Sequence, residues 1–157
     1  MQVTAAEIMT SPVITVTPEM SIAKVTNLMA TNNISGLPVV NEADVVVGII
    51  SEADIVNYSS RMHVVRLISS SKWVSPYTQI TDIASFRKGF EMLSKSKVKD
   101  IMFSKVVTVR ESATGEEIAR IMTRRKVNRV PVVDASGRIL GIITRANLVK
   151  YLAERGG

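Results

Sequence analysis

Apolar and polar positions follow the same order twice along this chain, 93 positions apart. Placing residues 8–56 over residues 101–149 needs no gap and gives 15 identities in 49 positions. The phrase GIISEAD at 48–54 returns as GIITRAN at 141–147, so Asp54 returns as Asn147. Two copies of one supersecondary unit are the simplest interpretation.

Each copy predicts the order strand, helix, strand, strand, helix. Short runs of β-branched residues predict the first strand, and apolar residues at spacings of three or four predict the first helix. In the first copy the expected strands are 13–16, 37–40 and 45–50, with helices after Ser21 and from Ser51. In the second copy they are 106–109, 130–133 and 138–143, with helices from Thr114 and Ala146. Glu117, three residues after Thr114, indicates a capping box at that helix start.

The repeat defines the expected domain organisation. We predict a first unit at 1–59, a connector at 60–97 and a second unit at 98–157. The connector has no counterpart in the repeat, and its apolar residues recur at helical spacing, so we expect it to be mostly helical. The fold class is therefore α/β (α+β).

Composition favours a compact soluble protein. Of 157 residues, 46% are hydrophobic and the mean hydropathy is +0.20. No uninterrupted apolar run approaches the roughly 20 residues that a membrane helix requires, and the N-terminus lacks the pattern of a secretory signal. We expect a cytoplasmic protein that does not insert into membranes.

The side chains most used in catalysis are scarce. The chain contains no cysteine and a single histidine, His63. This removes thiolate metal sites, cysteine nucleophiles and histidine pairs, and leaves no acid–base constellation that is easy to assemble. We expect no catalytic residues, no bound metal and no enzyme activity.

Charge is divided unevenly between the two halves. Residues 1–60 hold one base and six acids, whereas residues 61–157 hold 19 bases and eight acids. A basic half can attract phosphates, but a solvated surface together with self-association of the acidic half with the basic one is the favoured explanation. Because no aromatic residue is interleaved among the bases at 120–129, a base-stacking nucleic-acid surface is the less favoured interpretation.

The repeated phrase has a structural and a functional interpretation. As structure, Ser51 with Asp54 caps a helix, and Thr144 with Asn147 forms a weaker version of the same cap. As function, a strand that ends in Ser or Thr and turns at once into a helix offers a hydroxyl and free backbone NH groups to an anion. A carboxylate one turn later suits the two hydroxyls of a ribose. Phosphate plus ribose indicates a nucleotide.

The two copies together resemble a known family. Each contains a Met-containing start, a Thr-Val strand, a helix, a hydrophobic-Pro-Val-Val strand and Gly-hydrophobic-hydrophobic-Ser/Thr-x-x-Asp/Asn, and this order resembles tandem cystathionine-β-synthase (CBS) domains, the pair called a Bateman module. The resemblance covers about residues 3–59 and 96–154. It implies two β-α-β-β-α units packed about a pseudo-twofold axis, with two clefts between them that bind AMP, ADP, ATP or S-adenosylmethionine.

The resemblance also implies roles for individual residues. At the first cleft Asp54 holds the ribose, Ser51 contacts ribose or phosphate, and adenine lies against Ile49, Val106 and Val107. The expected residues of the second cleft are Thr144, Asn147, Ile142, Arg145, Asn128, Arg129, Val13, Ile14 and Ser35. Asn147 departs from the family pattern because it lacks an ionised acceptor with two oxygens, which weakens the expected ribose binding there. Ser35-Gly36 also replaces the Asn128-Arg129 pair in the first copy, so phosphate charge is expected from the basic unit.

These observations predict a regulatory module that binds an adenosine nucleotide or S-adenosylmethionine and signals by conformational change. The resemblance implies a homodimer and a regulated enzyme or transporter as partners. The alternatives are a ligand-free dimerisation adaptor and, less favoured, a nucleic-acid-binding protein that uses the basic second unit.

Overall fold

The computed structural model describes residues 2–61 and 91–155. The chain forms two compact units that do not coincide with a simple division into halves. Unit 1 comprises residues 1–15, 40–48 and 104–157, and unit 2 comprises residues 16–39 and 49–103. Each unit therefore contains the body of one repeat and the beginning of the other. The predicted boundaries at residues 59 and 98 follow the repeat in sequence and stay a prediction.

Unit 2 is built from the first repeat. Its elements are α2 (Ile22–Asn32), β1 (Gly36–Val40), β2 (Val46–Ser51), α3 (Glu52–Arg61) and α6 (Val98–Ile101). The last residue of β1 and the first half of β2, up to Gly48, are part of unit 1. Ser21 caps α2 by accepting a hydrogen bond from Lys24 N, and Asn33 ends the helix with a left-handed φ of 52°. These local signals confirm the predicted first helix, because a cap oxygen and a residue tolerant of positive φ bound a buried apolar face.

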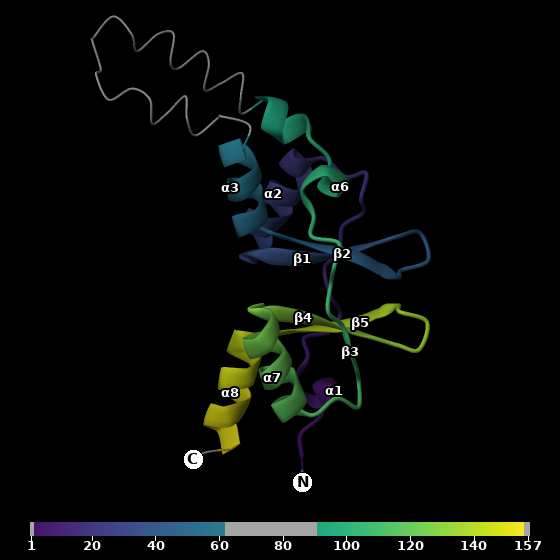
Figure 1. The fold of residues 1–157 in the computed structure, drawn as a ribbon, viewed down its shortest axis with the longest axis vertical. Coiled ribbons are helices and arrows are strands. Elements are labelled where there is room, and N and C mark those ends of the chain that lie inside the picture. The colour runs from purple at the N-terminus through teal and green to yellow at the C-terminus, as the bar shows by residue number, and fades with distance from the viewer. Residues whose placement is uncertain (1, 62–90, 156–157) are drawn as a thin grey trace, which may run out of the picture. The chain divides into compact units, whose positions relative to one another are not determined.

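Unit 1 contains the second repeat. Its elements are α1 (Ala5–Ile8), β3 (Val109–Arg110), α7 (Gly115–Arg125), β4 (Arg129–Val133), β5 (Ile139–Thr144) and α8 (Arg145–Arg155). The sheet order is β3-β4-β5, with β3 parallel and β5 antiparallel to β4. Helices α1, α7 and α8 lie on the same side of this sheet (Figure 1). The predicted capping box of Thr114 and Glu117 is confirmed at the start of α7.

The first predicted strand of each repeat is mostly absent. Residues 13–15 form no strand, and Val16 makes a single parallel bridge to Val39; in the second repeat only Val109 and Arg110 form β3. The reason is connectivity. Thr10 pairs with Ile142 in unit 1, whereas Val16 pairs with Val39 in unit 2. The residues between these two pairs run from one unit to the other, so they cannot continue a single ladder.

The connector lies largely outside the described residues. Residues 91–95 are helical, and the predictions for 62–90, including His63, fall in the part that the structure does not describe. Where the chain is described again, Lys97 and Lys99 both bond Glu19, at 2.7 and 2.8 Å, which holds the pKa of Glu19 at about 2.

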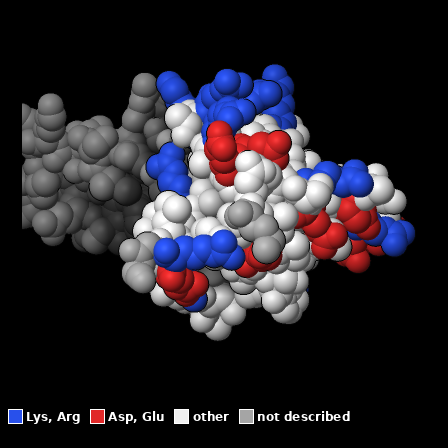
Figure 2. Space-filling model, turned by 90° about the horizontal axis from the view of Figure 1, so that it is seen from below, with Lys and Arg blue, Asp and Glu red and all other residues white. Residues whose placement is uncertain are grey.

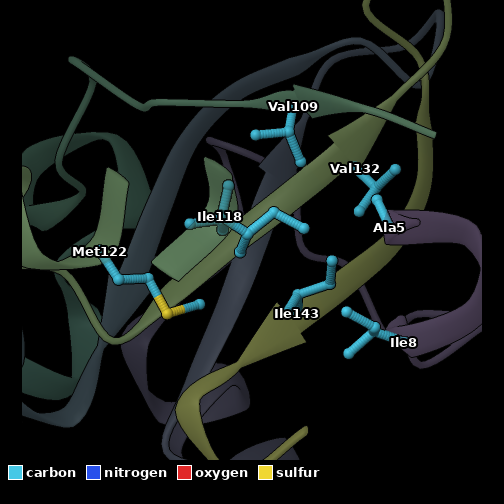
Figure 3. Packing of buried hydrophobic residues seen from close by; sticks show 8 residues of the cluster. Ala5, Ile8, Val109, Ile118, Met122, Val132 and Ile143 are labelled. Atoms are coloured by element: carbon cyan, nitrogen blue, oxygen red, sulfur yellow. The ribbon is translucent and has the colours of Figure 1, made fainter. Parts of the chain in front are cut away.

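The core of unit 1 joins the N-terminal segment to the second repeat. Ala5 and Ile8 of α1 pack with six buried residues of the second repeat, namely Val109, Ile118, Met122, Val130, Val132 and Ile143. In Figure 3 the side chains of Ala5 and Ile8 point toward those of Val132 and Ile143. Backbone bonds fix the same segment: Ala5 N donates to Ala113 O at 2.7 Å, and Gly115 N donates to Val3 O at 2.9 Å.

A close approach of Met9 explains the second glycine of the repeated phrase. A Cβ atom at Gly141 would lie 2.8 Å from Met9 Cγ and 3.0 Å from Met9 Cβ. We therefore expect Gly141→Ala to reduce the free energy of unfolding by about 1–3 kcal/mol, because overpacking displaces a neighbour. The two residues should couple, so Met9→Ala combined with Gly141→Ala should cost less than the sum of the single changes. Urea unfolding of the four proteins measures this; strictly additive costs would show that the contact does not matter.

Candidate functional site

The first repeated phrase forms a capping box at the junction of β2 and α3. Oδ2 of Asp54 accepts hydrogen bonds from Ser51 N and Ser51 Oγ, both at 2.9 Å. Ser51 Oγ in turn accepts a hydrogen bond from Asp54 N at 3.2 Å. The strand ends at Ser51 and the helix begins at the next residue, so the hydroxyl and the carboxylate lie together where the helix has unsatisfied NH groups.

The second phrase reproduces this geometry with an amide. Oδ1 of Asn147 accepts hydrogen bonds from Thr144 N and Thr144 Oγ1, both at 2.8 Å, and Asn147 N donates to Thr144 Oγ1 at 3.2 Å. The amide nitrogen of Asn147 also donates to Thr10 Oγ1 at 3.2 Å. The same three cap bonds are therefore made by Asp and by Asn.

The two caps leave different atoms for a ligand. Both cap bonds to the carboxylate of half-buried Asp54 go to Oδ2, so the cap does not use Oδ1. At Asn147 the single side-chain oxygen accepts both cap bonds, and an NH₂ group stands where Asp54 has its second oxygen. A carboxylate oxygen can accept two hydrogen bonds, whereas an NH₂ group accepts none. Capping and acceptance of ribose hydroxyls are thus compatible at Asp54.

Residues from two further segments adjoin the Asn147 phrase in unit 1. Arg145 N donates to Asn128 O at 3.0 Å, and Arg129 pairs with Thr144 across β4 and β5. The predicted second-site residues Asn128, Arg129, Ile142, Thr144, Arg145 and Asn147 therefore lie together in unit 1. Val13 and Ile14 also belong to unit 1, and Ile14 is 37% exposed.

Ser35 lies beside the other phrase. Its carbonyl accepts a hydrogen bond from Glu52 N at 2.9 Å, the counterpart in unit 2 of the bond between Arg145 N and Asn128 O. Val106 and Val107, predicted for the first site, are half-buried residues of unit 1. The assignment of these three residues to particular sites stays a prediction.

Sequence reasoning missed two residues that pair with the repeated phrase. Phe103 exchanges two backbone hydrogen bonds with Ile49, each at 2.9 Å, and Thr10 makes the equivalent pair with Ile142. Phe103 is 49% exposed, and its partner Ile49 lies two residues before Ser51 of the Asp54 cap. The repeat itself contained a signal for it, because Thr10 and Phe103 occupy the same aligned position and differ in chemistry.

A groove of about 260 Å³ lies between α1 and α8, next to Thr10 and Asn147. Its charged lining residues are Glu7, Lys150 and Glu154, two acids against one base. Glu7 is firmly ionised, since hydrogen bonds from the Thr4 backbone and side chain lower its pKa. This groove is therefore unsuited to a phosphate.

The described residues contain neither a metal-binding cluster nor a helix suited to a membrane. Between residues 2–61 and 91–155, no group of three or more His, Asp or Glu side chains is arranged to hold a metal ion. Of the helices in these same ranges, none combines the length and the apolar character that spanning a bilayer requires.

A match to a protein family agrees with this geometry. The model of the CBS domain matches the chain twice, at residues 5–61 and 98–154. Since these matches cover most of the 157 residues, the chain belongs to the CBS-domain family, with two CBS domains in tandem. The predicted resemblance is confirmed.

Two relatives from Methanocaldococcus jannaschii differ in how much of their length is matched. Uncharacterized protein MJ1426 is 31% identical over 150 residues, covering 93% of this chain and 89% of that protein. Inosine-5'-monophosphate dehydrogenase is 33% identical over 146 residues, covering 93% of this chain but 23% of the enzyme. The similarity to the dehydrogenase is thus confined to its CBS portion, and its activity does not carry over.

A solved structure supports the fold. CBSX2 of Arabidopsis thaliana in complex with AMP superposes with a TM-score of 0.71 and is 26% identical, covering 98% of this chain and 98% of that chain. The chain spans 56% of full-length chloroplastic CBSX2. The predicted fold class, a mixed α/β chain of the CBS-pair type, is confirmed.

Proposed function

We propose that this chain is a regulatory module that binds an adenosine nucleotide at the Asp54 cap. The observation that carries the proposal is the Oδ1 atom of Asp54, a carboxylate oxygen that the cap leaves available beside the Ser51 hydroxyl. Such an oxygen accepts the two hydroxyl hydrogens of a ribose through charge-assisted bonds. The complex of CBSX2 with AMP supports this class of ligand.

The adenine group is assigned to the neighbours of this cap. Phe103 and Ile49 offer an exposed ring and an aliphatic side chain against which adenine packs. At the start of α3 the NH groups of Glu52 and Asp54 already donate to Ser35 O and Ser51 Oγ. The Ser51 hydroxyl donates to Asp54 Oδ2, so this turn offers little to a phosphate. Because Glu52 and Asp54 add negative charge to this turn, we expect AMP to bind more tightly than ATP unless basic side chains of the second repeat contribute.

The Asn147 cap is assigned no ribose. Its oxygen is occupied by two hydrogen bonds and its NH₂ group already donates to Thr10. We therefore expect one nucleotide per chain. Binding would shift the conformational equilibrium of the chain toward the state that holds the ligand, and a partner enzyme or transporter would detect that shift.

Thermal unfolding with added ligand tests this proposal. A ligand that binds only the native state at 100 times its dissociation constant stabilises it by about 2.7 kcal/mol. We expect AMP to raise the melting temperature by several degrees, and guanosine monophosphate to raise it less. S-adenosylmethionine serves as the second adenosine ligand. If neither adenosine compound raises the melting temperature, the capped helices are purely structural and the proposal fails.

Dimerisation is a second proposal, supported by exposed apolar side chains on α3 and α8. Val56 is 60% exposed, Val149 at the matching position of the second repeat is 64% exposed, and Leu152 one turn further is 67% exposed. We expect a homodimer in sedimentation velocity, and a monomer when Val149 and Leu152 are both changed to Glu. Ala119→Glu, on the exposed side of α7, should leave the dimer intact. A wild-type monomer at all concentrations would contradict this proposal.

A further inference from the structure

A second groove, of about 600 Å³, lies on unit 1 between α7 and the segment that carries β3. Its apolar lining residues are Val109, Ala113 and Ile121, and three arginines, Arg110, Arg120 and Arg124, line it as well. We call it the arginine groove. All three arginines are exposed, and they share the lining of the groove with these apolar residues. The groove contains none of the residues assigned to the nucleotide.

The charge of the arginine groove is largely uncompensated. The acid that lines it, Glu117, is engaged in the helix cap, where its Oε2 accepts a hydrogen bond from Thr114 N at 2.8 Å. Arg120 bonds Glu116 at 2.8 Å, but both side chains are more than half exposed, and an exposed pair of this type exchanges readily for another carboxylate. The pKa of Asp134 is lowered mainly by the Arg138 backbone amide and only last by Arg110.

The first repeat shows that the fold does not require these arginines. The residues aligned with Arg110, Arg120 and Arg124 are Thr17, Asn27 and Thr31, all neutral, while the apolar Ile121 aligns with Leu28. Helices α2 and α7 have the same length and the same type of N-cap. The chain therefore contains one copy of this surface with three arginines and one without, on equivalent structural elements.

Lys and Arg side chains also gather visibly on this end of the protein. In Figure 2 they form a dense group at the top of the view with Asp and Glu directly below it, and elsewhere on this face basic and acidic side chains lie intermixed. A dense basic group attracts an acidic partner.

We propose that the arginine groove binds an acidic segment of a partner protein that also carries aliphatic side chains. Arginine forms paired hydrogen bonds with carboxylates, and the half-buried Ala113 and Ile121 of the lining suit an aliphatic side chain between them. A nucleic acid fits less well. No aromatic side chain lines the groove for base stacking.

The test compares peptide binding by two variants that each lose three positive charges. The groove variant combines Arg110→Thr, Arg120→Asn and Arg124→Thr, which are the residues of the first repeat. The control variant combines Arg125→Asn, Lys126→Asn and Lys150→Asn, which are also the residues of the first repeat and do not line the groove. Asn is well tolerated at position 126, where φ is 54°. Both variants should fold, as circular dichroism will verify.

The probe is a short fluorescein-labelled peptide with the repeating unit Asp-Glu-Leu, and fluorescence anisotropy measures its binding. We expect the groove variant to bind at least about tenfold more weakly than wild type, because three exposed ion pairs of about 0.5 kcal/mol are lost. The control variant should bind within about threefold of wild type. A peptide with Gly in place of Leu should bind more weakly than the Leu peptide to wild type.

Three results would overturn the proposal. Equal losses in both variants would mean diffuse attraction to a basic surface, and absence of binding by wild type would mean that the groove has no such ligand. Tighter binding of a labelled thymidine oligonucleotide, lost in the groove variant, would assign the groove to nucleic acid. The AMP-induced rise in melting temperature should be the same in the groove variant and in wild type, so this proposal and the nucleotide proposal fail separately.

Discussion

Asp54→Asn should weaken AMP binding by about 10- to 150-fold and leave the fold of the chain intact. The change removes the carboxylate oxygen that the cap does not use and puts an NH₂ group in its place. Loss of hydrogen bonds to an ionised acceptor costs about 1.5–3 kcal/mol, which gives the expected range of affinity. Isothermal titration calorimetry measures it directly.

The second repeat predicts that this variant will fold. Asn147 makes the same three cap bonds as Asp54, with distances that differ by no more than 0.1 Å. We therefore expect the melting temperature of unliganded Asp54→Asn to remain close to that of wild type. Asp54→Ala would lose the cap and the ligand contact together, so it cannot separate the two roles.

Asn147→Asp is the matched control. It introduces a carboxylate at the equivalent cap while leaving Asp54 unchanged, and it replaces the donor that Thr10 now accepts from. We expect AMP to bind the Asp54 site of this variant with unchanged affinity. Unchanged affinity in Asp54→Asn, with altered affinity in Asn147→Asp, would place the nucleotide at the second repeat and contradict the assignment.

The parts of the fold that the sequence predicted are those encoded by neighbouring residues. Ser21 and Thr114 start helices because their oxygens reach an NH group three residues away. The four strands β1, β2, β4 and β5 are nearly continuous apolar runs around the polar turns at 41–44 and 134–137. Such signals act within about five residues, so they can be recognised without knowledge of distant contacts.

The parts that could not be predicted depend on residues far apart in the sequence. Val13–Thr15 has the composition of a strand, but its neighbours Thr10 and Val16 pair in different units. Phe103 comes near the first repeated phrase only because its backbone pairs with Ile49. Neither pairing can be predicted from the residues next to it in the sequence. The sequence also could not show which oxygen of Asp54 the cap uses. It identifies the carboxylate, but only the structure shows that both cap bonds go to Oδ2.

Ile8→Ala should destabilise the protein by about 2–4 kcal/mol, although the residue lies near the N-terminus. Terminal residues usually tolerate change because few contacts hold them. Ile8, however, is 7% exposed and packs in the core of unit 1 with Ile143 and other residues of the second repeat. Truncating a buried isoleucine removes its transfer free energy and leaves a cavity, so the loss should fall at the upper end expected for a single substitution.

Ala6→Ser is the control for this prediction, because Ala6 is an exposed residue of the same short helix. Its cost should stay within about 0.5 kcal/mol. Urea unfolding followed by circular dichroism measures both variants, and hydrogen exchange should show the lost protection in α7 and β4, which pack in the same core as Ile8. If Ile8→Ala costs no more than Ala6→Ser, residues 5–8 are not part of the unit 1 core. If the predicted loss is found, the core of the second CBS domain is complete only with residues at the start of the first, which ties the stability of one repeat to the beginning of the other.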